Sequence, residues 1–306
     1  MSLFDAFPDS MNDGVQNLQL IDYSQIVISN LMYYFSPGDI IEPINARKII
    51  IDALRSHVLK HKNEYPNIVI AVDSVDGYWR RDRVAPYYKK HREKIKDDSG
   101  WDWNAIYSAM NLVRQELINH LPYKTLYIPG AEADDIFGVL VKHLKSVDPS
   151  VKIHITSADG DFTQLQKYDG VRQWNPMHKK WVKPEYGSPE RDLLVKIIKG
   201  DRKDTISNIF SVSDHIISSD KNQKQVRKQL LSSVFESKDP RSLFTGDELK
   251  RYNENEILVD LDKIPDDISK KIIEAYNTYK PAPRGRLTNY FITHGMADLI
   301  GKESEF

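Results

Sequence analysis

Cysteine is absent from the 306-residue sequence, which excludes disulfides, thiol catalysis and thiolate metal sites. No apolar run approaches the roughly 18 residues that a membrane-spanning helix needs. The first fourteen residues contain three aspartates and no basic residue, so they do not read as a signal peptide. These absences are compatible with a reducing cytoplasm, where we expect this chain to work.

An excess of charge of one sign is also missing. The 43 basic and 44 acidic residues give a net charge of −1, so no global positive field attracts nucleic acid. This average conceals a segregation: residues 1–46 contain six acids and no Lys or Arg, whereas residues 80–96 contain eight basic residues and two acids. Segregated charge of this kind indicates two working surfaces of opposite sign.

Short apolar runs alternate with helical patterns after a polar stretch at residues 1–16, which we interpret as a flexible tail. The runs at 17–21, 67–72, 124–128 and 151–156 predict buried strands. Apolar residues at helical spacing lie between them, at 50–58, 106–117 and 136–144. This alternation predicts an α/β fold with a mostly parallel central sheet. Residues 171–174 and 180–182 predict a hairpin at its edge.

The character of the chain changes after Lys183. Residues 184–306 show helical stretches, such as 192–198 and 266–276, and few strand signals, while 211–220 is rich in Ser and Asp and predicts a loop. We therefore expect an α/β domain at 17–183 and a smaller helical region at 184–306.

Acidic residues follow every predicted parallel strand. In open α/β sheets, sites form at the carboxyl ends of the strands, so these acids are expected on one rim. A turn near residue 200 supplies two more. The eight acids of this rim are Asp22, Asp73, Glu132, Asp134, Asp159, Asp161, Asp201 and Asp204.

Each acid alone is more often structural, because Asp favours turns and acids favour the first turn of a helix. Together they would repel one another and raise one another's pKa. A pair of Mg²⁺ ions, which prefer oxygen ligands, would hold them ionised. Two such ions are a known arrangement for phosphodiester cleavage.

The basic segment at 77–96, GYWRRDRVAPYYKKHREKIK, interleaves aromatic and cationic residues. This composition is typical of surfaces that stack bases and hold phosphates, although a solvated amphipathic helix is the alternative. Because the segment follows Asp73 closely, we expect it to overhang the acidic rim.

Two other patterns carry no predicted chemistry. His57 and His61 have the spacing of a zinc-protease pair, but Val58 stands where the catalytic glutamate would be, so we predict a surface pair. Asp260 and Asp262 are predicted to be structural.

Several strings occur in an order that resembles the 5′-nuclease (flap endonuclease) family, and within it the ribonuclease H branch of T-even-type bacteriophages. They are LIDYSQI, AVDSVDGYWRRD, AEADD, SADGDFTQL, QWNPMHKKW, KGDRKD, LVDLDKIPDD and YKPAPRGR. The resemblance spans nearly the whole chain. It implies a PIN-like 5′-nuclease core with a helical arch at 80–100 and a C-terminal region that grips duplex.

The resemblance also implies roles for single residues. One metal ion would be held by Asp22, Asp73 and Asp134, and a second by Asp159, Asp161 and Asp204, with Glu132 between them and Asp201 in an outer shell. Arg80 and Lys89 would bind the scissile phosphate. Arg81, Tyr88, Lys90 and Arg92 would contact nucleic acid in the arch. Cellular members have a glycine-rich hairpin where residues 205–219 here contain no glycine, and Lys221, Lys224, Arg227 and Lys228 would substitute for it.

The activity implied is a 5′→3′ exonuclease and flap endonuclease with two Mg²⁺ ions, which Mn²⁺ would replace. Its substrates would be DNA and RNA·DNA duplexes with 5′ ends or flaps, and its role the removal of RNA primers in phage replication inside the host cell. We expect a monomer with no membrane contact, and a single-strand-binding protein and a sliding clamp as candidate partners. Residues 286–292 faintly resemble a clamp-binding peptide, but a buried terminal helix is favoured.

Two alternatives remain. A non-catalytic DNA-junction binder would have lost rim acids, and none of the matched positions is lost. An aspartate-nucleophile phosphatase is suggested by Asp159 and Asp161, but that chemistry expects its Asp-x-Asp after the first strand, where Tyr23 and Ser24 follow Asp22.

Overall fold

The computed structural model describes residues 16–219 and 221–306. The tail predicted at 1–16 lies outside these residues except for Gln16. Within the described part, no helix combines the length and the apolar character needed to cross a membrane.

The centre of the molecule is a six-stranded sheet in the order β3-β2-β1-β4-β5-β6. The strands are β1 (Leu18–Asp22), β2 (Asn67–Val72), β3 (Lys124–Tyr127), β4 (Ile153–Thr156), β5 (Val171–Asn175) and β6 (Lys180–Val182). β1 to β5 pair in parallel and β6 pairs antiparallel with β5. The predicted mostly parallel sheet with an edge hairpin is confirmed.

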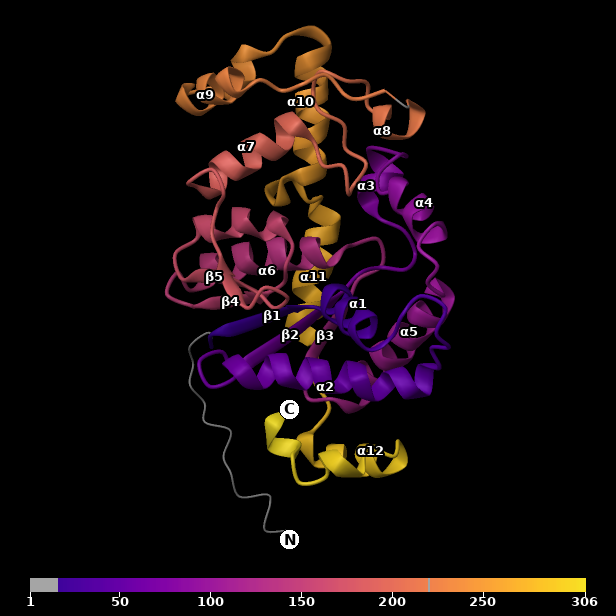
Figure 1. Cartoon of the computed structure of the whole chain (residues 1–306). Coiled ribbons are helices and arrows are strands. Elements are labelled where there is room, and N and C mark those ends of the chain that lie inside the picture. Colours follow the sequence, from indigo (N-terminus) through magenta and orange to yellow (C-terminus); the bar gives the residue numbers. More distant parts are fainter. Residues whose placement is uncertain (1–15, 220) are drawn as a thin grey trace.

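Helices cover both faces of the sheet (Figure 1). One face packs on α1 (Tyr23–Tyr34), α2 (Pro43–His61) and α5 (Trp103–His120). The other packs on α6 (Ala133–Val147) and α11 (Asp266–Thr278). Alternation along β1 separates the two cores, because Leu18 and Leu20 face α6 whereas Ile21 faces the first group.

Residues of the C-terminal half pack against both faces of the sheet and also form a third apolar cluster, together with Tyr87 and Tyr88. α7 (Pro189–Lys199), α9 (Lys228–Glu236) and α10 (Gly246–Val259) gather at one end, with the one-turn helix α8 (His215–Ser218) nearby (Figure 1). At the opposite end, α12 (Leu287–Thr293) buries Leu287, Tyr290 and Phe291 against the first face. The favoured interpretation of 286–292, a buried terminal helix, is thus confirmed.

The basic segment forms two short helices, α3 (Trp79–Arg83) and α4 (His91–Asp97). Between them, Tyr87 and Tyr88 are buried against the C-terminal helices. The base of the predicted arch is therefore fixed by packing.

Two smaller predictions were wrong. The predicted loop at 211–220 contains α8, and Asp220 lies outside the described residues. His57 and His61 are half-buried rather than on the surface, because the His61 ring packs 4.0 Å from the fully buried His154 ring.

Candidate active site

Four of the predicted acids lie at the carboxyl ends of parallel strands without an ion pair among the described residues. We call Asp22, Asp73, Asp134 and Asp159 the open carboxylates. Asp22 ends β1 and caps α1, Asp73 follows β2, Asp134 lies in the first turn of α6, and Asp159 follows β4. The strand ends therefore deliver these side chains to one rim, as the sequence predicted.

Hydrogen bonds fix the open carboxylates from within the fold. Asp22 accepts from the Gln25 backbone N–H at 3.1 Å and from the Ser157 hydroxyl at 3.0 Å. Asp73 accepts from the backbone N–H of Ala133 at 2.8 Å, which ties β2 to the start of α6. These contacts orient the carboxylates but do not neutralise them.

The electrostatics of the open carboxylates show mutual repulsion. Burial, together with the charges of Asp73 and Asp159, raises the pKa of Asp22 to about 7. Burial and the charge of Asp159 raise the pKa of Asp134 well above its ordinary value. Without a cation, the chain keeps these groups together at a cost in stability.

Three of the other four acids face one another from η1 (Gly160–Lys167) and the turn after α7. Carboxylate oxygens of Asp161, Asp201 and Asp204 lie within 4.8 Å of one another. We call these three the paired carboxylates. The resemblance had placed Asp201 in an outer shell, whereas here its carboxylate belongs to this converging group.

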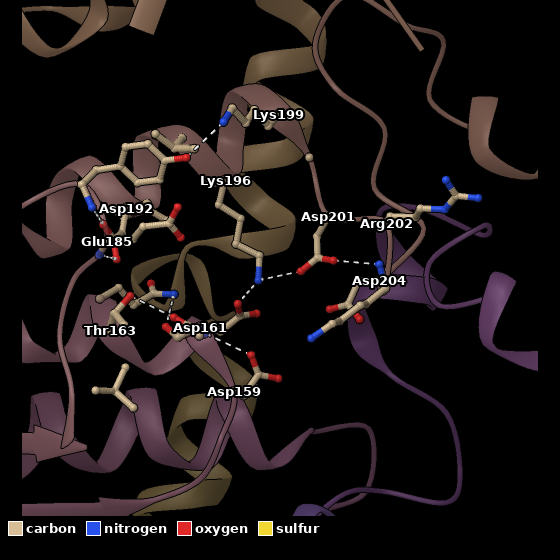
Figure 2. Close-up of a pocket in the computed structure, with 18 of the residues that line it drawn as sticks. Asp159, Asp161, Thr163, Glu185, Asp192, Lys196, Lys199, Asp201, Arg202 and Asp204 are labelled. Atoms are coloured by element: carbon tan, nitrogen blue, oxygen red, sulfur yellow. Dashed lines mark hydrogen bonds and ion pairs between the residues drawn. The ribbon is translucent and has the colours of Figure 1, made fainter. Parts of the chain in front are cut away.

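Two side-chain cations compensate the paired carboxylates. Lys196, on α7, forms ion pairs with Asp161 and with Asp201, the latter at 2.9 Å (Figure 2). Arg92, in the arch, binds Asp204 at 2.5 Å. Burial alone would raise the pKa of Asp204, but the charges of Lys89, Arg92 and Lys196 outweigh it and hold that pKa below its usual range.

A cavity of about 460 Å³ opens on this group and is lined by both acids and cations. Its lining includes Asp159, the paired carboxylates and Lys196, together with Tyr186 and Lys199. Figure 2 shows Asp161 and Asp201 pointing toward the Lys196 ammonium. Asp159 is thus the open carboxylate that lines this hollow together with the paired carboxylates.

Arg80 does not lie where the resemblance implied. Its side chain is 2% exposed and forms ion pairs with Glu132 at 3.0 Å and Asp135 at 2.7 Å, and its Nε donates to the Leu258 carbonyl of α10. A guanidinium enclosed in this way does not reach a phosphate. In this structure Arg80 instead fastens the arch and the start of α6 to the C-terminal helices.

Glu132 also differs from its expected role between two ions. Its buried carboxylate pairs with Arg80 and Lys89 and accepts from the Tyr88 hydroxyl at 3.1 Å. Those partners occupy its oxygens. Glu132 therefore orients Lys89 and Tyr88 at the rim.

Lys89 and Tyr88, predicted to meet the phosphate and to line the arch, are both buried at its base. Burial opposes the charge of Lys89, but Glu132 and Asp204 raise its pKa well above the ordinary value. The Tyr88 hydroxyl also donates to Asp204 at 3.3 Å. Lys89 remains a rim cation, whereas Tyr88 lies behind the arch surface.

The remaining predicted nucleic-acid contacts lie on the surface. Arg81 is half-buried, donating to the Tyr88 carbonyl and pairing with Glu93 at 3.3 Å, while Lys90 is exposed. Lys221, Lys224, Arg227 and Lys228 are all exposed. Asn208 anchors their segment by donating to the Lys224 carbonyl at 2.7 Å.

Sequence reasoning missed two residues of the site. Lys196 gave no signal, because nothing local links α7 to Asp161. Asp135 did give a signal in the sequence. It lies at the third position of helix α6, three residues after the N-cap residue Glu132, where an acid can complete a capping box. Its carboxylate accepts from the Glu132 N–H at 2.9 Å and from the Trp79 indole N–H at 3.0 Å.

The chemistry of these groups fits a hard divalent cation. The open carboxylates offer oxygen ligands, and a bound cation would relieve the raised pKa values of Asp22 and Asp134. The paired carboxylates converge closely enough to share an ion, but Lys196 and Arg92 already compensate them.

Comparison with known proteins agrees with this geometry. The family model "5'-3' exonuclease, N-terminal resolvase-like domain" matches residues 18–188, and "T4 RNase H, C terminal" matches 187–306. The chain is 38% identical over 299 residues to the ribonuclease H of Enterobacteria phage T4, covering 96% of this chain and 97% of that protein. A 5'-3' exonuclease of Buchnera aphidicola is 32% identical over 124 residues, covering 40% of this chain and 37% of that protein.

Solved structures share the fold at low identity. The flap endonuclease of bacteriophage T5, in a pseudo-enzyme-product complex with DNA and metal ions, superposes with a TM-score of 0.57 at 18% identity, covering 86% of this chain and all of that one. The T5 5'-exonuclease with bound zinc gives 0.58 at 17%, covering 87% and 100%. The fold is thus that of the PIN-like 5′ nucleases. The chain belongs to the 5′–3′ exonuclease family, with a C-terminal region of the T4 ribonuclease H type, and is a phosphodiester-cleaving hydrolase.

Proposed function

We propose that this nuclease uses two Mg²⁺ ions to cleave DNA and RNA·DNA duplexes at 5′ ends and flaps. The observation that carries the proposal is the group of open carboxylates, which form no ion pair with a side chain of the described residues. Asp22, Asp73, Asp134 and Asp159 would hold one ion, and the paired carboxylates the second. When bound, the ions would stabilise the charge that develops on the phosphate, and Mn²⁺ would replace them.

The chain's own cations would position the substrate. Lys89 lies at the rim, where it pairs with Glu132, and would turn from it to a phosphate oxygen of the substrate. Its ammonium would donate to that oxygen as negative charge grows there. The exposed Lys90 of the arch would hold the phosphates of a single-stranded 5′ end.

The duplex would lie across the end of the molecule formed by α7, α9 and α10 (Figure 1). The exposed cations at 221–228 belong to the same half of the chain as the turn that carries Asp201 and Asp204, and they would hold the duplex backbone. Similarity to the T4 ribonuclease H supports RNA primers of lagging-strand fragments, inside the bacterial host, as the natural substrate.

A labelled-end assay tests the proposal. A 5′-labelled RNA primer on a DNA template is incubated with the protein and Mg²⁺, and in parallel with EDTA. Metal-dependent release of short 5′ products is the expected result. Binding without products would support a junction binder, and loss of the terminal phosphate alone would support a phosphatase; either outcome overturns the proposal.

Changing Lys89 to Ala separates catalysis from binding. We expect single-turnover cleavage to slow by about 10²-fold while the dissociation constant for duplex changes less than about threefold, because one charge among many contributes little to binding. Gel-shift titration in EDTA measures the binding. A variant that binds poorly but cleaves at the wild-type rate when saturated would contradict the assigned role.

Replication partners remain part of the proposal. The aromatic residues of 286–292 are buried, so a sliding clamp would have to bind elsewhere on the chain. Pull-down of a clamp and of a single-strand-binding protein by the full chain tests both partners, and sedimentation tests the expected monomer.

A further inference from the structure

The base of the arch is fastened to the turn that carries the paired carboxylates. The Lys89 backbone N–H donates to the Asp204 carbonyl at 2.9 Å, and the His91 N–H donates to the Thr205 hydroxyl at 3.0 Å. Arg92 adds its bond to the Asp204 carboxylate. We call this set of contacts the arch clasp.

Backbone strain is concentrated at the same junction. Lys89 has a φ of 59° and Thr205 a φ of 63°, and three non-glycine residues with positive φ occur in the described chain. The third, Lys179, lies in the β5–β6 turn. Such conformations are unfavourable for residues with a Cβ and persist where surrounding contacts hold them. Both strained residues of the clasp are held by the contacts just named, so releasing the clasp would relieve them.

The clasp also occupies the ligand oxygens of Asp204. Oδ1 accepts from Arg92 and Oδ2 accepts from the Tyr88 hydroxyl. A cation that takes Asp204 as a ligand must therefore compete with Arg92. The Arg92 side chain is 42% exposed, so it can turn toward solvent or toward a phosphate when it gives up Asp204 and the Lys203 carbonyl, to which its Nε donates at 3.1 Å, whereas Asp204 is 8% exposed and stays.

We propose that Arg92 couples arch position to ion binding at the paired carboxylates. An ion bound by Asp161, Asp201 and Asp204 displaces Arg92 and loosens the arch clasp. A phosphate in the arch that pairs with Arg92 frees Asp204 for the ion. Since linkage is reciprocal, nucleic acid tightens the second ion by the same factor as the ion tightens nucleic acid. This inference rests on the proposed two-ion function.

Binding of Mn²⁺ without nucleic acid tests the coupling. Calorimetric and electron paramagnetic resonance titrations compare wild type, Arg92→Gln and Lys94→Gln. Lys94 is exposed on the same helix and has no ion pair among the described residues, so its variant controls for the loss of one arch charge. We expect Arg92→Gln to tighten the weaker Mn²⁺ site by roughly 5- to 50-fold and Lys94→Gln to change it less than about twofold.

Hydrogen exchange of the wild type gives a readout that needs no variant. Saturating the weaker site with Mg²⁺ should speed exchange of the Lys89 and His91 amides, which the clasp protects. Unchanged Mn²⁺ affinity in Arg92→Gln, or amide protection that Mg²⁺ leaves intact, overturns the coupling alone. Absence of any Mn²⁺ binding overturns the proposed two-ion function as well.

Discussion

The two groups of carboxylates use the same side chain in opposite electrostatic settings. Asp22 and Asp134, among the open carboxylates, have raised pKa values because burial and neighbouring acids oppose ionisation. Asp204, among the paired carboxylates, has a lowered pKa because three cations surround it. No side-chain cation of the described chain forms an ion pair with the first group, whereas Lys196 and Arg92 form ion pairs with the second. In the proposed function, an ion would therefore relieve repulsion at the first group and would compete with side chains at the second.

This difference explains the geometry of the two groups. The three paired carboxylates converge within 4.8 Å because Lys196 and Arg92 draw them together. The open carboxylates repel one another. Hydrogen bonds from Gln25 and Ser157 hold Asp22 in place, and one from Ala133 holds Asp73. The close approach of the three paired carboxylates is therefore explained by the ion pairs that Lys196 and Arg92 form with them.

Replacing one acid from each group gives the largest predicted contrast. Asp134→Asn removes a repelled charge, so we expect the free energy of unfolding in EDTA to rise by about 1 kcal/mol or more. Asp204→Asn removes the carboxylate whose charge Lys89, Arg92 and Lys196 compensate. We therefore expect the free energy of unfolding to fall by about 1–3 kcal/mol. Both variants should lose cleavage by about 10³-fold or more.

Thermal or urea unfolding in EDTA measures the stability, and the labelled-end assay measures the activity. Asp262→Asn is a matched control, since Asp262 pairs with Lys142 and Lys167 far from the arch clasp and should leave cleavage unchanged. Destabilisation of the same sign and size in Asp134→Asn and Asp204→Asn would remove the distinction between the groups.

Much of the fold was predictable from local pattern. The predicted parallel strands match within two residues, and the carboxyl-end rule placed Asp22, Asp73, Asp134 and Asp159 on one rim. Helix α1 was not predicted, because apolar residues occur all round it and leave no one-sided pattern in the sequence. Eight of its twelve residues are not buried. Asp260 and Asp262 were correctly interpreted as structural, since Asp260 caps the following turn.

The pairing of the rim residues was not predictable. Arg80 was assigned to a phosphate, but its partner at Leu258 lies 178 residues away, so its burial follows from tertiary packing alone. The contact of Arg92 with Asp204 spans 112 residues. Charge counting identified which surface is basic and which acidic, whereas which cation neutralises which acid depends on the packed structure.

The dependence of folding stability on pH gives a second test of the difference between the open and the paired carboxylates. Asp22, with a folded pKa of about 7 against an ordinary value of 3.8, favours the folded state while protonated. That contribution is lost as pH rises from about 4 to about 7. Asp22→Asn keeps the helix cap but does not titrate. We expect its stability relative to wild type to grow across this window by at most about 4 kcal/mol.

Urea unfolding at half-unit pH steps in EDTA measures this difference between Asp22→Asn and wild type. Mg²⁺ at pH 7 should shrink it, because an ion bound to the open carboxylates stabilises the wild type. A difference that stays flat from pH 4 to pH 7 would show that Asp22 is not held in a repelled state.

The smallest predicted effect concerns Lys196, the cation between Asp161 and Asp201. Lys196→Gln removes a charge that competes with an ion at the paired carboxylates. We expect the weaker Mn²⁺ site to tighten by about tenfold, which is about 1.4 kcal/mol, while the stronger site at the open carboxylates is unchanged. Lys199→Gln, one turn further along α7, is the matched control because its ammonium binds the Tyr186 hydroxyl instead. If Lys196→Gln shifted both sites equally, the two groups would respond as one electrostatic unit, and the division between open and paired carboxylates would fail.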